Sequence, residues 1–202
     1  MPDIRTVWSF GISKECRMEH WIRKRNNKAR IHTWDPTPIS QNTIIKENRS
    51  TYKWPIKHNN KAYDPHKEAA TFYCSDPSLR CYSLENFYPE KLVDSFTVEC
   101  TSLAKIKDTL GENVDLIKFD IEGRWYEMCN EILDLKLPVK QVIGEFEMYM
   151  GDTDTEFDKL QSVIDRFEDN GYKTYCNRLL AEKTVDTFIP DNPVVELAFL
   201  KI

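Results

Sequence analysis

Carboxylates follow several of the apolar, strand-like runs of this 202-residue sequence. Asp35 and Asp120 each come directly after such a run, and Glu145 and Glu147 lie at the end of another. In an open sheet of parallel strands, ligands bind beyond the carboxyl ends of the strands, where the strand order reverses. We therefore expect these carboxylates to converge on one crevice. Each of them alone is equally typical of a turn or of a helix N-terminus.

Two kinds of chemistry suit this group. Asp120, with Glu145 or Glu147 as the second candidate, can act as a general base that takes the proton of a hydroxyl group. Alternatively, Asp120, Glu145 and Glu147 can bind Mg²⁺, which prefers oxygen ligands and would acidify a bound hydroxyl. The sequence does not choose between these routes. For Glu122 and Glu147, a structural ion pair or a helix N-terminus explains the residue equally well.

Asp35 points to a different kind of ligand. An acid at the end of a second strand can accept hydrogen bonds from both ribose hydroxyls of an adenosine, although a turn before Pro36 also explains it. The preceding run SFGISKE contains one glycine, Gly11, where a dinucleotide-binding fingerprint has three. A smaller adenosine ligand without phosphates is therefore favoured over a dinucleotide.

The elements that must position these residues alternate between strand and helix, which predicts an α/β fold with a parallel sheet. The last two strands have no helix between them and should pair antiparallel. Expected strands are 4–10, 29–34, 51–56, 69–75, 94–100, 114–119, 139–146, 172–178 and 194–202, and expected helices are 15–25, 39–47, 101–110, 125–135 and 154–170.

The chain is expected to form a single domain over residues 1–202, interrupted by an irregular insertion at about 57–93 on the substrate side. Insertions above a sheet often carry the groups that determine specificity. The polar residues of this segment that could contact a substrate are His58, His66, Tyr73, Tyr82 and Ser83, and residues 57–60 are expected to form a turn.

Composition excludes several classes of protein. The chain has 28 Lys and Arg against 33 Asp and Glu, a formal charge of −5, which argues against a general nucleic-acid binder. No apolar stretch approaches the roughly 18 to 20 residues needed to span a bilayer, and the first residues lack the apolar region of a signal peptide. We therefore expect a soluble, cytoplasmic protein with neither a nucleic acid nor a membrane as partner.

The runs WSFGIS, HTWDPTP, VECTSL, VDLIKFDIEG and VIGEFEM together resemble the FkbM-like family of S-adenosylmethionine-dependent methyltransferases. The resemblance extends from about Val7 to Glu147, and its most specific parts are DPTP and the DxEG motif at 120–123. It implies a Rossmann-like class I methyltransferase fold. Such a fold has a mostly parallel seven-stranded sheet, an antiparallel terminal strand pair and helices on both faces.

The resemblance also implies the cofactor S-adenosylmethionine and a role for each matching residue. Asp35 would hold the ribose, while Asp120 and Glu122 would line the reaction crevice. The remaining residues are Ser9, Phe10 and Gly11 beside the methionine part of the cofactor, and Pro36 and Thr37, which would shape the loop after the second strand.

The activity implied by the resemblance is O-methylation of a hydroxyl on a small molecule or glycan, with a terminal rhamnose as the expected acceptor. It further implies that glycosyltransferase domains are joined to this chain in a longer, virus-encoded protein that works in the host cytoplasm. Two positions depart from the family: Trp125, where a second glutamate is common, and Glu147, where histidine is common. These departures keep open a catalytically inactive module that binds a glycan or a protein partner. A nucleotide-dependent oxidoreductase is disfavoured by the missing glycines.

Overall fold

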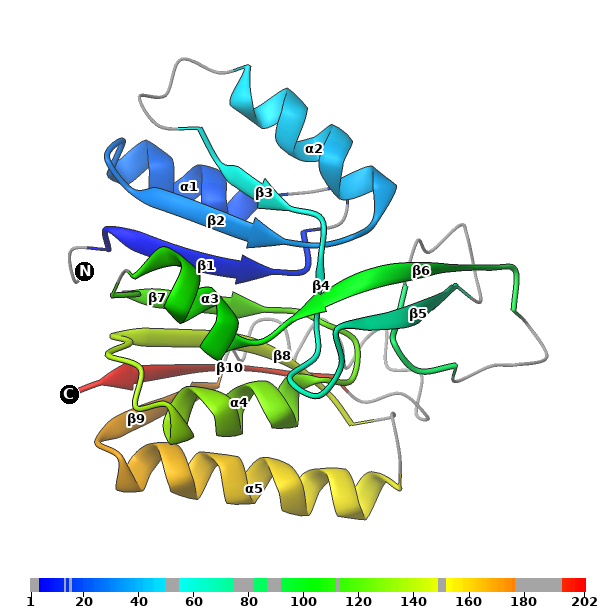
Figure 1. Ribbon diagram of the computed structural model, residues 1–202. Coiled ribbons are helices and arrows are strands. Elements are labelled where there is room, and N and C mark those ends of the chain that lie inside the picture. Colours follow the sequence, from blue (N-terminus) through cyan, green and yellow to red (C-terminus); the bar gives the residue numbers. More distant parts are fainter. Residues whose placement is uncertain are drawn as a thin grey trace, which may run out of the picture.

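The computed structural model describes residues 4–12, 14, 16–49, 55–74, 82–86, 92–111, 113–148, 152–176 and 194–202. Within these residues, a seven-stranded sheet has the order β3-β2-β1-β7-β8-β10-β9 (Figure 1). Its strands are β1 (Thr6–Phe10), β2 (Arg30–Trp34), β3 (Lys57–Asn59), β7 (Leu116–Phe119), β8 (Gln141–Glu147), β9 (Tyr172–Cys176) and β10 (Val194–Lys201). The pairs among β3, β2, β1, β7 and β8 are parallel, and β10 is antiparallel to both β8 and β9. The predicted mostly parallel sheet with an antiparallel terminal pair is thus confirmed.

Helices cover both faces of this sheet, as expected. Successive strand residues point to opposite faces. Val7 accordingly packs in one apolar cluster with residues of α1 (Arg17–Arg25) and α2 (Pro38–Asn48), whereas Trp8 packs in another with α3 (Leu103–Leu110), α4 (Trp125–Asp134) and α5 (Thr153–Asp169). No helix in the described part of the chain is long and apolar enough to cross a membrane.

Local signals fix the ends of two of these helices. The Ser102 side chain accepts a hydrogen bond from the Lys105 backbone N–H at the start of α3, and Gly111 ends that helix in the left-handed conformation. The Asp152 side chain caps α5 in the same way. The buried stripe of α5 includes Leu160, Val163 and Phe167, which recur at helical spacing.

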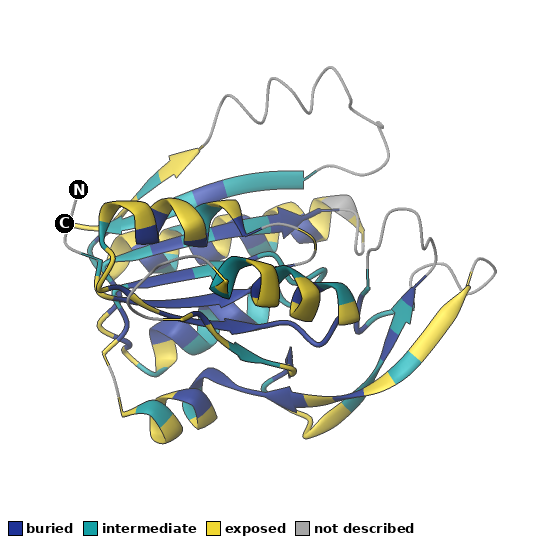
Figure 2. Cartoon of the chain, turned by 90° about the horizontal axis from the view of Figure 1, so that it is seen from above, coloured by how far each residue is buried: buried dark blue, intermediate teal, exposed yellow. Residues whose placement is uncertain are grey.

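Part of the segment predicted to be an irregular insertion belongs to a second sheet, which it forms together with the strand predicted at 94–100. Its strands β4 (Ala62–Tyr63), β5 (Ala69–Cys74) and β6 (Asp94–Thr101) have the order β4-β6-β5. Figure 1 shows β5 and β6 projecting past the carboxyl ends of the central parallel strands, and Figure 2 shows much of β6 exposed. The small sheet has its own apolar cluster of Ala62, Phe72, Leu84, Val98 and Cys100. This separate core explains why strand 94–100 pairs with β5 and not with the central sheet.

The edge strand β3 also differs from expectation. The sequence predicted a strand at 51–56 and a turn at 57–60, whereas β3 spans Lys57–Asn59; residues 51–54 lie outside the described residues. Polar residues can form this strand because their side chains bond to its neighbour. His58 Nδ1 lies 2.8 Å from Thr33 Oγ1, and Asn59 donates to the Thr33 carbonyl at 3.0 Å.

Candidate active site

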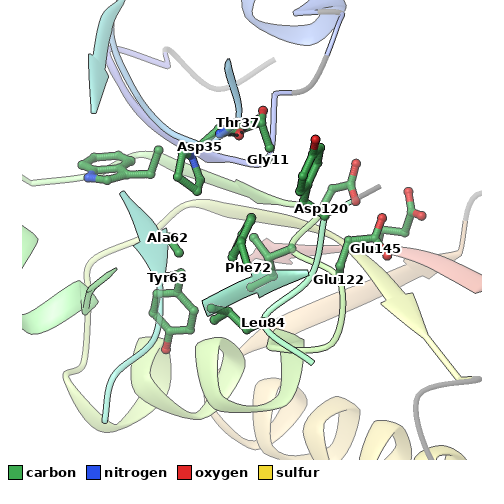
Figure 3. A pocket seen from close by; sticks show the side chains of 14 residues that line it. Gly11, Asp35, Thr37, Ala62, Tyr63, Phe72, Leu84, Asp120, Glu122 and Glu145 are labelled. Carbon is green, nitrogen blue, oxygen red and sulfur yellow. Dashed lines mark hydrogen bonds between the residues drawn. The ribbon is translucent and has the colours of Figure 1, made fainter. Parts of the chain in front are cut away.

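A pocket opens beyond the carboxyl ends of β1, β2, β7 and β8 (Figure 3). The chain leaves β1 towards β2 on one side and later returns to place β7 on the other side. The strand order therefore reverses between β1 and β7, and such a switch point is where open α/β sheets bind ligands. The lining residues are Gly11, Trp34, Asp35, Pro36, Thr37, Ala62, Tyr63, Phe72, Tyr82, Leu84, Asp120, Ile121, Glu122 and Glu145.

Gly11 allows β1 and β7 to approach each other at this point. Its backbone has φ +74°, and a Cβ atom there would lie 1.7 Å from the Asp120 carbonyl oxygen. The Asp120 N–H in turn donates to the Phe10 carbonyl at 3.1 Å. No residue with a side chain fits between these two backbones without moving one of them.

Asp35 ties together the loops that follow β1 and β2. One carboxylate oxygen accepts from the Ile12 N–H at 2.8 Å, and the other accepts from the N–H and the hydroxyl of Thr37 at 2.8 and 2.6 Å. The side chain is 6% exposed. The residue expected to hold a ribose therefore also has a structural role, since it shapes this wall of the pocket.

Ser9 and Phe10 do not line the pocket, although they precede Gly11. Both are fully buried. The Ser9 hydroxyl donates to Glu19 of α1 at 2.5 Å, and the Phe10 ring stacks on Trp34 at 4.8 Å. Of the six residues expected around the cofactor, the pocket brings together Gly11, Asp35, Pro36 and Thr37.

Three of the predicted carboxylates do converge. Asp120, Glu145 and Glu147 each offer an oxygen, and these oxygens lie within 4.8 Å of one another. At an effective dielectric constant near 20, two full negative charges at that distance repel by roughly 3.5 kcal/mol. Lys118 offsets part of this charge: its Nζ lies 3.8 Å from an Asp120 oxygen and donates to the Gly11 carbonyl at 2.5 Å.

The environment makes the two glutamates hard to ionise. Burial, followed by the charges of Asp120 and Glu122, raises the pKa of Glu145 to about 8. Burial also raises the pKa of Glu147 well above its ordinary value, with Glu122 and Asp120 adding to the effect. Glu145 therefore favours a bound proton at neutral pH, and burial disfavours the ionised form of Glu147 as well. Groups with such shifted values are typical of sites that transfer protons or bind cations.

Glu122 occupies an unusual backbone conformation in the loop between β7 and α4. Its φ is +50°, in the left-handed region that costs a residue with a side chain roughly 1–2 kcal/mol. Two contacts hold the loop: the Ser83 hydroxyl donates to the Glu122 carbonyl at 2.9 Å, and the Gly123 N–H donates to Glu147 at 3.2 Å. Ser83, which is bridged to Tyr73 of the second sheet, and β8 together thus fix the position of Glu122 at the pocket.

The second sheet and the segment 82–86, which is bridged to β5, contribute an aromatic and aliphatic wall, of which the sequence analysis singled out Tyr82 alone. Tyr63, Phe72, Tyr82 and Leu84 line the pocket, and the Phe72 and Tyr82 rings are nearly parallel at 6.5 Å. Figure 3 shows Phe72 and Leu84 on one side of the pocket, with Asp120, Glu122 and Glu145 along another. That the insertion lies on the substrate side stays a prediction, and nothing in the sequence pattern singled out the apolar members of the wall.

The polar residues expected to contact a substrate separate into different positions. Tyr82 lines the pocket and Ser83 holds the Glu122 loop. His58 lies instead between Thr33 and Ser40, 2.8 and 3.3 Å from their hydroxyl oxygens. His66 and Tyr73 are not among the lining residues.

Trp125, one of the two departures from the family pattern, belongs to the core. It is 1% exposed and packs edge-on against Phe146 at 5.2 Å. Its side chain does not line the pocket. Glu147, the other departure, belongs to the acidic cluster.

Comparisons with known proteins agree with this architecture. The chain superposes on the fibrillarin pre-rRNA processing protein of Methanococcus jannaschii with a TM-score of 0.52 at 10% identity, covering 100% of this chain and 69% of the other. The METTL16 methyltransferase domain superposes with a TM-score of 0.48 at 10% identity, and this chain spans 61% of the length of that domain. The search of curated proteins returns no match. The fold is that of a Rossmann-like class I methyltransferase.

Sequence comparison defines the class more narrowly. The methyltransferase FkbM domain matches residues 10–174. Apart from the first four residues of β1, this range includes every strand and helix beside the pocket. The chain therefore belongs to the FkbM methyltransferase family. Together, the family and the fold define an S-adenosylmethionine-dependent methyltransferase.

Proposed function

We propose that this chain transfers the methyl group of S-adenosylmethionine to a hydroxyl of a sugar or glycan, with a terminal rhamnose as the acceptor to test first. The proposal rests on one observation: carboxylates that can take a hydroxyl proton face an aromatic and aliphatic wall in the same pocket. An apolar ring wall suits the C–H face of a sugar, while the carboxylates suit its hydroxyls. Glycosyltransferase domains joined to the chain in a longer protein would supply such an acceptor.

The two ends of the pocket suit different parts of the reaction. The end formed by Gly11, Asp35 and Thr37 is proposed to take the cofactor, with Asp35 near the ribose. The end formed by Asp120, Glu122 and Glu145 is proposed to take the acceptor hydroxyl.

Methyl transfer is an in-line displacement in which the acceptor oxygen bonds to the methyl carbon as the carbon–sulfur bond breaks. Alignment of the three reacting atoms can supply roughly 7–11 kcal/mol of the barrier reduction. The acceptor hydroxyl must also lose its proton, and a positioned carboxylate contributes about 10²–10⁴-fold. Asp120, which is 38% exposed at the pocket, is the first candidate for this proton, and Glu145 is the second. The same carboxylates also have the donor chemistry of an Mg²⁺ site.

Cofactor binding is tested by thermal unfolding with S-adenosylhomocysteine in EDTA, with NAD as the control ligand. Ligand at 100 times its dissociation constant adds about 2.7 kcal/mol to stability. For a chain of this length the expected rise in midpoint is roughly 5–10 °C. A rise with NAD and none with S-adenosylhomocysteine would overturn the assignment of the cofactor.

Turnover is tested by methyl transfer to a rhamnose-terminated glycan. Asp120→Asn is expected to lower the rate by about 10²-fold or more while S-adenosylhomocysteine still binds. Asp158→Asn is the matched control, since Asp158 is an exposed carboxylate on α5. If the cofactor binds but no sugar hydroxyl is methylated, the chain is instead a binding module of this fold.

A further inference from the structure

The acidic end of the pocket gathers several carboxylates. Besides Asp120, Glu145 and Glu147, it includes Glu122 in the pocket lining, and Glu196 lies beside it, opposite Glu145 in the register of β8 and β10. Lys118 also approaches this end, but its ammonium group is shared between Asp120 and the carbonyls of Phe10 and Gly11.

Glu147 supplies an independent observation that points to a missing partner. Its side chain is 1% exposed, and one of its oxygens accepts from the Gly123 N–H. The other oxygen, Oε1, is buried and has no hydrogen-bond partner among the described residues. Buried polar atoms are almost always paired, because leaving one unpaired is costly. A carboxylate oxygen in such a position needs either a proton or a cation.

We propose that Asp120, Glu145 and Glu147 bind a hard divalent cation, with Mg²⁺ as the ion of first choice. Oxygens on opposite sides of an Mg²⁺ ion lie about 4.2 Å apart, since each bond is roughly 2.1 Å. The three carboxylate oxygens already lie within 4.8 Å of one another, so a small closure brings them around one ion. Glu147 binds from the buried side, whereas Asp120 and Glu145 line the pocket and leave the remaining coordination positions open towards it.

The role of this ion in the reaction rests on the proposed function, but the site itself does not. An ion with open positions binds the oxygen of the acceptor and lowers the pKa of its hydroxyl group. With the ion bound, Asp120 and Glu145 act as its ligands, and Glu122, which lines the pocket outside the three ligands, replaces them as the acceptor of the proton.

The site is tested on the unmodified chain alone, without cofactor or acceptor. Mn²⁺, whose ligand preference is close to that of Mg²⁺, is titrated and the free ion is followed by electron paramagnetic resonance. Saturable binding that Mg²⁺ displaces is expected. Glu147→Gln and Glu145→Gln should each weaken binding about tenfold or more, since each removes a ligand charge.

Glu196→Gln is the matched control, because Glu196 lies beside the site without belonging to the three ligands. Its affinity for Mn²⁺ should stay within about threefold of the unmodified chain, as long-range charge alone is screened by solvent. Circular dichroism checks that each variant folds. If Glu147→Gln does not fold, Glu145→Gln makes the same comparison.

Two outcomes would overturn the proposal: no saturable Mn²⁺ binding by the unmodified chain, or equal affinity in the chain and in its folded ligand variants. The first would mean that a proton occupies the cluster. Binding of S-adenosylhomocysteine in EDTA is measured in parallel. If S-adenosylhomocysteine binds but Mn²⁺ does not, only the proposed cation site is wrong. If Mn²⁺ binds but S-adenosylhomocysteine does not, only the proposed function is wrong.

Discussion

The two ends of the pocket are built in opposite ways. At the β1–β2 end, the Asp35 carboxylate accepts three hydrogen bonds from the neighbouring loops, and Gly11 lets two backbones touch. At the β7–β8 end, oxygens of three carboxylates lie within 4.8 Å of one another, and a buried oxygen of Glu147 has no hydrogen-bond partner in the described part of the chain. One end has its polar groups satisfied by the fold, and the other does not.

This difference separates the part of the pocket that fixes a shape from the part that can react. A satisfied polar network is rigid before any ligand arrives, and so it lowers the cost of ordering on binding. An unsatisfied cluster keeps unfavourable electrostatics that a proton, a cation or a reacting hydroxyl relieves. Replacing an acid by its amide should therefore have opposite effects on stability at the two ends.

The largest expected effect comes from Gly11→Ala, at the rigid β1–β2 end of the pocket. A left-handed conformation costs an alanine roughly 1–2 kcal/mol, and relieving the overlap with the Asp120 carbonyl adds roughly 1–3 kcal/mol. A loss of about 2–5 kcal/mol is expected in urea unfolding. Gly111→Ala is the control, because Gly111 also has a positive φ of 58° but nothing lies within 4 Å of its added Cβ. Equal losses in the two variants would show that the approach of β1 and β7 does not constrain Gly11.

Asp35→Asn should come next. An amide nitrogen cannot accept a hydrogen bond, so either the Ile12 N–H or the Thr37 groups lose their partner. Leaving such a buried group unpaired costs roughly 1–3 kcal/mol. Urea unfolding measures the loss, and calorimetry with S-adenosylhomocysteine measures the accompanying fall in affinity. A variant as stable as the parent would mean that the loops hold their shape without this carboxylate.

The corresponding change at the reactive β7–β8 end of the pocket, Glu145→Gln, should stabilise the chain at high pH in EDTA. The pKa of Glu145 is about 8 in the folded chain, against 4.5 as its ordinary value. Between these values the folded state binds more protons than the unfolded state, so stability falls as pH rises from about 4.5 to 8. Glutamine carries no charge, and the variant should match the parent at pH 4 and exceed it at pH 8.

Thermal melts across this pH range measure the effect, in which each pKa unit between the folded and unfolded values corresponds to about 1.4 kcal/mol at most. Parallel curves for parent and variant would contradict the assigned shift. Mg²⁺ should flatten the parent's decline, because an ion favours the ionised carboxylates that the fold alone disfavours. The same ion should do less for the variant.

The sequence predicted the central sheet well because each signal was local. Apolar runs, breaks at Asp35 and Asp120 and the missing helix before the last strand were enough to predict parallel strands and an antiparallel terminal pair, but not the order of the strands in the sheet. The small sheet was missed because β5 pairs with β6 across some twenty intervening residues, and neither strand carries a signal for its partner. β3 was missed because its polar residues resemble a turn until their bonds to Thr33 are known.

The acidic end of the pocket was predictable and its opposite wall was not. Carboxylates at the ends of parallel strands must meet, since those ends share one edge of the sheet. Phe72 and Leu84 lie at the pocket because they belong to the apolar cluster of the second sheet. In the sequence, an apolar residue at such a position cannot be distinguished from a residue of the core. Ser9 and Phe10 show the converse limit: adjacency to Gly11 in the sequence does not bring their buried side chains to the pocket.

The smallest expected effect connects the second sheet to the reactive end, through Ser83→Ala. This change removes the hydrogen bond from Ser83 to the Glu122 carbonyl and the one that its oxygen accepts from the Glu85 N–H. A stability loss of about 1 kcal/mol is expected. Because the bond to Glu122 holds a strained residue at the pocket, kcat should fall by roughly tenfold while the affinity for S-adenosylhomocysteine stays the same.

Thr109→Ala is the matched control for this change. Thr109 also donates its hydroxyl to a backbone carbonyl, at 2.7 Å, but it lies on the exposed side of α3. Its loss should lower stability by no more than about 1 kcal/mol and leave kcat unchanged. If Ser83→Ala also leaves kcat unchanged, the Glu122 loop keeps its conformation without the second sheet. The contacts from β8 alone, through Glu147 and Gly123, would then be sufficient to position the acidic end.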